Sequence, residues 1–170
     1  MAVQLTGTAA GASLIAAAGA VRRQPPLAVV LMLAGFMLIY LCTHALAHWA
    51  VGRLVGLRFA CFGLRGTDHP ESYPPGIRQL MSVLPMFTAA STRRSRARAG
   101  RWALAAYFAA GESATTVFSI LAAVLALRLG VPGAGILLAL AVVYDTAATV
   151  VTAIIPKGDY AKALRALRAP

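Results

Sequence analysis

Two histidines, His44 and His48, stand in a long apolar stretch and are the residues of this sequence best suited to chemistry. They are four positions apart, so both imidazoles project from one face of a helix and could bind a single metal ion. The same spacing occurs in H-E-x-x-H zinc enzymes, in which the glutamate activates water. Here that position is Ala45. The spacing therefore predicts a metal site, and the alternative is a histidine pair that only hydrogen-bonds and packs in a helical bundle.

Two acidic residues, Glu112 and Asp145, interrupt two further apolar stretches. A charged group at membrane depth costs at least ~2.5–3.5 kcal/mol, so such groups commonly serve a function. Glu112 could be a base, a metal ligand or a carboxyl kept neutral by desolvation, and Asp145 belongs to the same class. The alternative for each is that it pairs with a neighbouring polar group and fixes helix packing.

The composition indicates that the surrounding solvent is lipid. Of the 170 residues, 59% are hydrophobic and 12% are charged, against roughly 45–50% and ~25% in soluble domains. A spanning helix needs about 20 apolar residues, so this length allows three or four spans and no separate soluble domain. We therefore predict an all-α polytopic membrane protein that forms a single membrane domain over residues 1–170.

The long apolar stretches predict three core transmembrane helices, over residues 27–51, 102–129 and 131–155. Residues 5–21 form a weaker N-terminal helix, whose Ala and Gly suit close packing against a partner helix. Residues 52–101 are expected to be a mostly extramembrane connection, in which the apolar segment 80–90 is too short to span and is interfacial or re-entrant. The basic segment 157–170 is expected to be an interfacial helix.

The formal charge of +11 comes from 16 Lys and Arg against 5 Asp and Glu. The basic residues flank apolar stretches and lack interleaved aromatics, so we expect contact with anionic lipid headgroups and no nucleic-acid partner. Five of them form a cluster, Arg93, Arg94, Arg96, Arg98 and Arg101.

Placing this cluster and the basic tail in the cytoplasm, as the positive-inside rule requires, fixes the topology. Residues 27–51 then run inward, 102–129 outward and 131–155 inward, in a bacterial cytoplasmic membrane. All four intramembrane ionisable groups fall within roughly 5–15 Å of the cytoplasmic boundary. These depths are compatible with one shared polar pocket.

The residues that follow the histidine pair resemble a known motif. The stretch His44-Ala45-Leu46-Ala47-His48 leads through Gly52-Arg53-Leu54-Val55-Gly56-Leu57-Arg58. It resembles the first motif of the site-2 protease family of intramembrane zinc metallopeptidases, an H-E-x-x-H followed by a small residue, a basic residue and a leucine-glycine-aliphatic segment. The departure is Ala45.

Two later segments agree in order with the same family, so the resemblance covers roughly residues 27–168. The segment 109–115 resembles its Ala-Gly-Pro-x-x-Asn motif, with Gly111 kept, Glu112 in place of proline and Thr115 in place of asparagine. The segment 153–160 resembles an Asn-x-x-Pro segment that leads to an Asp-Gly. Here Asp159 comes two residues early, Ala153 stands in place of the asparagine, and no glycine follows.

The resemblance implies that His44 and His48 bind zinc. The third ligand is Asp159 by motif or Asp145 by membrane depth, and we favour Asp145 because the site must lie well inside the bilayer. Ala45 cannot supply general acid-base catalysis, which is worth ~10²–10⁴-fold.

The sequence therefore leaves three functions open. The first two differ in whether the chain is an enzyme. The first, which we favour, is a site-2-protease-like protein without peptidase activity, acting as a zinc-binding, membrane-embedded binding or assembly subunit that works with other membrane proteins. The second is an active intramembrane protease that uses Glu112 as its base. The third is an accessory subunit of a bioenergetic complex, in which His44 or His48 ligates a haem or chlorophyll.

Overall fold

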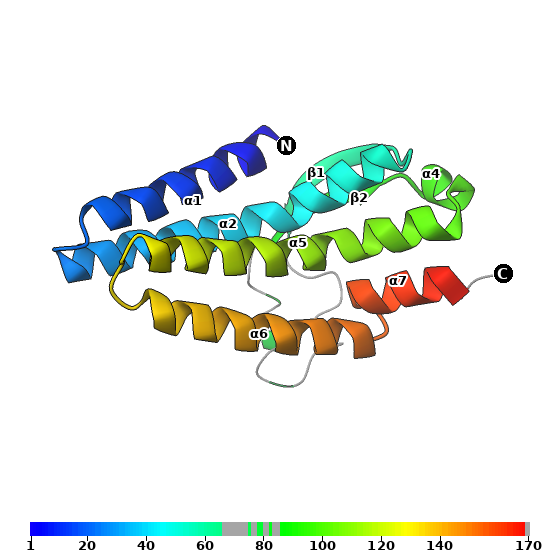
Figure 1. The fold of residues 1–170 in the computed structure, drawn as a ribbon. Helices are drawn as coiled ribbons and strands as arrows, with labels where there is room; N and C mark the ends of the chain where they lie inside the picture. The colour runs from blue at the N-terminus through cyan, green and yellow to red at the C-terminus, as the bar shows by residue number, and fades with distance from the viewer. Residues whose placement is uncertain (66–74, 76–77, 80–81, 83–85, 169–170) are drawn as a thin grey trace. The chain divides into compact units, whose positions relative to one another are not determined.

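The computed structural model describes residues 1–65, 75, 78–79, 82 and 86–168, and these are largely helical (Figure 1). Among them, four helices are long and apolar enough to cross a membrane: α1 (Ala2–Ala20), α2 (Pro25–Leu54), α5 (Arg101–Arg128) and α6 (Ala134–Ile154). The chain is an integral membrane protein, and the predicted all-α polytopic fold is confirmed. The N-terminal helix joins the three predicted core helices as a candidate span.

The helix ends follow from proline and glycine. Helix α2 begins with Pro25, which suits a first turn because the N–H that proline lacks would have no partner there. It ends just before Gly56, whose φ of 85° suits glycine. Between α5 and α6 the tight turn contains Gly130 and Gly133, with φ of 68° and 79°. Helix α6 consequently starts three residues later than predicted.

The connection between α2 and α5 contains a small antiparallel sheet that the sequence did not predict. Strand β1 (Phe59–Arg65) pairs with β2 (Met86–Ser91), and Phe59 lies opposite Ser91. The short helix α4 (Arg93–Arg98) follows directly. Residues 86–90, the last part of the apolar segment 80–90, thus belong to a strand. Residues 80–81 and 83–85 lie outside the described residues.

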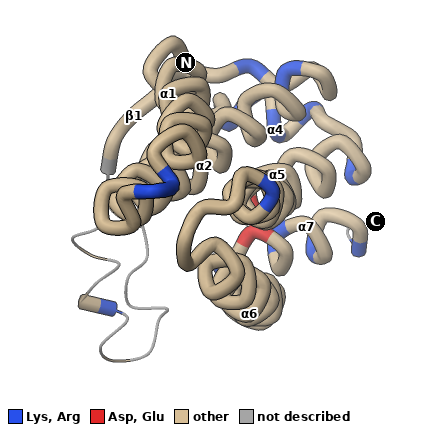
Figure 2. Tube along the Cα trace, turned by 60° about the vertical axis from the view of Figure 1, so that its left-hand side comes forward, with Lys and Arg blue, Asp and Glu red and all other residues tan. Residues whose placement is uncertain are grey.

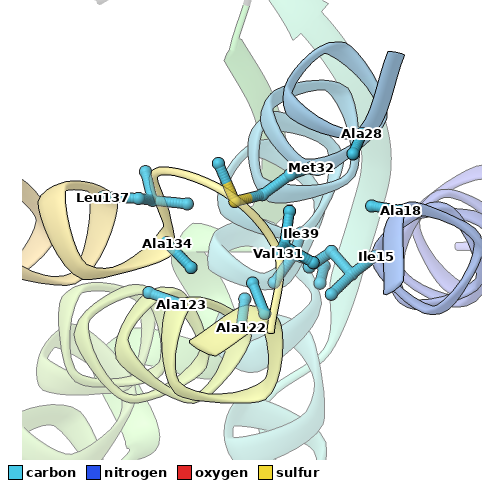
Figure 3. Packing of buried hydrophobic residues seen from close by; sticks show 11 residues of the cluster. Ile15, Ala18, Ala28, Met32, Ile39, Ala122, Ala123, Val131, Ala134 and Leu137 are labelled. Atoms are coloured by element: carbon cyan, nitrogen blue, oxygen red, sulfur yellow. The ribbon is translucent and has the colours of Figure 1, made fainter. Parts of the chain in front are cut away.

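The chain divides into two compact units, Met1–Thr43 with Ser113–Ala147 and His44–Glu112 with Ala148–Pro170. In the first unit, aliphatic and small side chains from α1, α2, α5 and α6 form the core (Figure 3). Helices α1 and α2 approach closely at Gly11 and Gly35. A Cβ atom at Gly11 would lie 2.7 Å from the Gly35 carbonyl oxygen, so the N-terminal helix does pack through small residues.

The second unit contains both histidines. It comprises the last turns of α2, both strands, α4, the first turns of α5, the end of α6 and the amphipathic helix α7 (Asp159–Arg168). The predicted basic C-terminal helix is therefore present. The positions of its Lys and Arg residues, like those of α4, are coloured blue along the backbone in Figure 2.

Candidate metal centre

His44 and His48 lie side by side on α2. Their ring centroids are 4.8 Å apart, as expected for positions i and i+4 of a helix. Both side chains are half-buried. The geometry that the spacing predicted for the pair is therefore present.

Asp159, the first residue of α7, completes a group of three at this point. Its Oδ2 lies 3.1 Å from Nε2 of His48 and 3.4 Å from Nε2 of His44. Among the described residues, these three are the side chains placed so that they could hold a metal ion together. Their ligand atoms all lie within 4.8 Å of one another. The structure thus brings the motif candidate, Asp159, to the histidine pair.

A tight turn after α6 carries Asp159 to this position. The N–H of Gly158 donates to the carbonyl oxygen of Ile155 over 2.8 Å. A Cβ atom at Gly158 would lie 2.1 Å from the carbonyl oxygen of Thr152, so any other residue would force the turn open. The turn lets a residue that follows the end of α6 reach side chains several turns inside α2.

Lys162 holds the second oxygen of the same carboxylate. Its Nζ donates to Oδ1 of Asp159 over 3.0 Å, from one turn further along α7. This contact leaves Oδ2 facing the histidines. Metal-binding carboxylates are commonly hydrogen-bonded in this way, which fixes their orientation.

A backbone carbonyl fixes the ring of His48. Nδ1 of His48 lies 2.8 Å from the carbonyl oxygen of Tyr107 on α5. Since a carbonyl only accepts hydrogen bonds, Nδ1 must be the donor, and in the neutral ring the lone pair is then on Nε2. Nε2 is also the atom that faces Asp159. This is the arrangement that metal-binding histidines commonly show.

Gly111 allows α5 to come close to the histidine pair. A Cβ atom at this position would lie 2.2 Å from Nε2 of His48 and 2.9 Å from Cε1 of His44. Gly111 is buried, and no side chain larger than a hydrogen fits there without moving the imidazoles.

The distances from the Asp159 carboxylate to the two imidazoles fit a small tetrahedral cation. Zinc binds imidazole nitrogen and carboxylate oxygen at about 2.0–2.2 Å, so two ligands at tetrahedral positions are roughly 3.3–3.5 Å apart. The distances from Asp159 Oδ2 to the two Nε2 atoms, 3.1 and 3.4 Å, are close to this value. Two nitrogens and one oxygen also match the ligand sets of zinc sites that keep a fourth position open.

The electrostatics of the site favour an ionised Asp159. Burial by itself raises the pKa of this carboxyl, but the hydrogen bonds that Nε2–H of His44 and His48 donate, and the positive charge of these protonated rings, outweigh burial and hold the pKa well below its ordinary value. A metal ion bound at the site would replace these Nε2 protons and attract the carboxylate in their place. The carboxylate is therefore available as a ligand across the physiological pH range.

Asp145, which we favoured as the third ligand, has a different environment. It belongs to the first unit, is 2% exposed, and its Oδ2 accepts a hydrogen bond from the Ser119 hydroxyl. We expected Asp159 at the membrane interface because it follows Pro156 and Lys157. The turn at Gly158 instead brings its carboxylate to the histidines.

Glu112 lies in the same unit as the histidines, one residue after Gly111 on α5, and is half-buried. Ala45, at the position where the resembling family has its glutamate, is fully buried. Among the described residues, the group that could hold a metal ion consists of His44, His48 and Asp159, and Asp145 belongs to the other unit.

Three contributors to this site were not predicted: the Tyr107 carbonyl, Gly158 and Lys162. A backbone acceptor leaves no mark in a sequence, and the need for glycine at position 158 arises from a contact with Thr152. For Lys162 a signal existed, since its spacing of three from Asp159 places both on one helix face.

No protein-family model matches this chain, and neither a curated protein nor a solved structure matches it.

Proposed function

We propose that this chain is a membrane-embedded zinc-binding protein of the site-2 protease type that lacks peptidase activity and serves as a binding or assembly subunit. The observation that supports zinc binding best is the convergence of Nε2 of His44, Nε2 of His48 and Oδ2 of Asp159 within 4.8 Å. Zinc at these ligands would act as a Lewis acid and would tie α7 to α2.

The sequence motifs give independent support for the family assignment. His44, His48, Gly111 and Asp159 come from three separate segments whose order resembles that of the family. In the structure these same residues lie against one another. The glycine kept from the second motif is the residue whose missing side chain makes room for the imidazoles.

Ala45 is the reason to propose binding or assembly in place of hydrolysis. Peptide hydrolysis at zinc needs a base that takes the proton of water and returns it to the leaving amine. Ala45 is fully buried and carries no ionisable group. In a protein that keeps the ligands and lacks the base, the metal would serve to hold the protein's own helices together or to bind a partner membrane protein.

The geometry also favours a small cation over a haem or chlorophyll. A macrocycle needs open space beyond the ligating nitrogen. Nε2 of His48 faces Asp159 at 3.1 Å, and the backbone at Gly111 lies close beside it. An absorption spectrum of the purified protein without pigment bands would agree with this proposal, and a Soret or chlorophyll band that the His48→Ala variant loses would overturn it.

The zinc proposal is tested with protein purified in lipid nanodiscs. We expect about one zinc per chain by elemental analysis, lost in His44→Ala, His48→Ala and Asp159→Asn. Asp145→Asn is the matched control, because it removes a buried carboxylate of the other unit and should bind zinc like the unchanged chain. Absence of zinc after dialysis against buffered zinc, or loss of zinc in Asp145→Asn alone, would overturn the proposal.

The peptidase alternative, with Glu112 as base, needs its own experiment. We expect the zinc-loaded chain to cleave a single-span membrane peptide substrate of active site-2 proteases no faster than the His44→Ala/His48→Ala variant does. Cleavage that both His48→Ala and Glu112→Gln abolish would establish the protease and refute the non-peptidase proposal.

A further inference from the structure

One arginine of the basic cluster differs from the others. Arg93, Arg94, Arg98 and Arg101 are exposed, whereas Arg96 is half-buried. Its Nη1 donates to the carbonyl oxygen of Ser91 over 2.9 Å and to the Ser91 hydroxyl over 2.8 Å. Contact with lipid headgroups suits the exposed members, but Arg96 is directed toward the interior of its unit.

Ser91 passes this contact on to α5. Its hydroxyl donates to the phenolic oxygen of Tyr107 over 3.1 Å, and both residues are 7% exposed. Ser91 ends β2 and pairs with Phe59 of β1, whose ring packs edge-on against the ring of Tyr107 at 6.1 Å. The Tyr107 side chain is thus held at its tip by Ser91, and its ring contacts Phe59.

Tyr107 is also the residue that holds His48. Its carbonyl oxygen accepts from Nδ1 of His48 over 2.8 Å, and its ring lies 5.3 Å from the imidazole, centroid to centroid. A continuous series of contacts therefore runs from Arg96 through Ser91 and Tyr107 to His48. All four residues belong to the second unit.

Such a series has a defined energetic consequence. A buried hydroxyl that loses its partner costs about 1–3 kcal/mol, so removing the Arg96 guanidinium should make Ser91 and Tyr107 move to recover hydrogen bonds. Groups that orient a metal-binding histidine typically change metal affinity by 10–100-fold when they are removed.

We propose that Arg96 is a positioning residue for His48, acting through Ser91 and Tyr107 on the ring that binds the metal. The proposal rests on the proposed zinc site. It means that Arg96 of the basic helix α4 helps to orient one of the metal ligands. It separates Arg96 from its four neighbours in the cluster, which are exposed.

The test compares Arg96→Gln with Arg94→Gln, which removes the same charge from an exposed position of the same helix. We expect Arg96→Gln to weaken zinc binding about tenfold in a chelator competition titration, and Arg94→Gln to leave it within twofold. Tyr107→Phe should weaken binding in the same direction, and the Arg96→Gln/Tyr107→Phe double variant should be little weaker than either single variant.

Two spectroscopic readings separate positioning from a general loss of stability. The visible bands of the cobalt-substituted protein should shift in Arg96→Gln and not in Arg94→Gln. In the metal-free protein, the ¹⁵N resonances of His48 should report protonated Nδ1 in the unchanged chain and an altered ring environment in Arg96→Gln. Lower thermal stability with unchanged zinc affinity, cobalt bands and ¹⁵N shifts would overturn the inference.

The outcome is also distinct from failure of the zinc proposal. If the unchanged chain binds zinc and both arginine variants bind it equally well, the inference fails and the zinc site stands. If the unchanged chain binds no zinc, the zinc proposal fails, and identical His48 resonances in Arg96→Gln and Arg94→Gln would refute the positioning role separately.

Discussion

At the residue scale, Gly111 decides how closely α5 approaches the histidines. A methyl group there would lie 2.2 Å from Nε2 of His48, well inside van der Waals contact. We expect Gly111→Ala to displace the imidazole and weaken zinc binding by at least tenfold, measured by chelator competition. Gly135→Ala is the control, because a Cβ atom at that α6 position meets nothing within 4 Å. Equal zinc affinity in the two variants would contradict the geometry described for the site.

Asp145 supports a second prediction at the same scale. Its carboxylate and the Ser119 hydroxyl are both buried and bonded to each other within the first unit. Ser119→Ala leaves the carboxyl without this donor, which costs about 1–3 kcal/mol and should lower the Tm in detergent by roughly 2–4 °C for each kcal/mol. Zinc affinity should not change. Lower affinity together with the lower Tm would show that Asp145 supports the metal site after all.

At the element scale, the turn before α7 determines whether Asp159 reaches the histidines. A Cβ atom at Gly158 would lie 2.1 Å from the Thr152 carbonyl oxygen. Gly158→Ala should therefore shift the start of α7 and give cobalt bands like those of Asp159→Asn, with the histidine pair still bound. Gly100→Ala, where a Cβ meets nothing within 4 Å, should keep the bands of the unchanged chain. Unchanged bands in Gly158→Ala would show that the turn does not position the carboxylate.

Some of the helices and strands could be predicted from the sequence alone, and others could not. The spanning helices were predicted to within a few residues, because long apolar stretches bounded by Pro25 and the Gly130–Gly133 turn leave few alternatives. The β1–β2 pair was not predicted, since its partners Phe59 and Ser91 are far apart along the chain and each strand is short. The histidine pair is a local pattern on one helix, whereas its third ligand depends on a turn that only packing reveals.

At the scale of the whole molecule, the cysteines offer a test of the proposed orientation. Cys61 is exposed on β1, and Cys42 is buried within α2. The connection between α2 and α5 also carries the arginine cluster, so the proposed cytoplasmic location of that cluster applies to Cys61 as well. Both sulfurs are free thiols, and labelling needs no introduced residue.

We expect a membrane-impermeant maleimide to label Cys61 in inverted vesicles and not in intact spheroplasts. Cys61→Ala should abolish the label, and Cys42→Ala should leave it unchanged, because the thiol of Cys42 is covered by the protein and lies in a spanning helix. Labelling of Cys61 in spheroplasts would reverse the orientation and place the arginine cluster outside. The metal site would then face the opposite compartment, because its ligands lie in the same unit as β1 and α4.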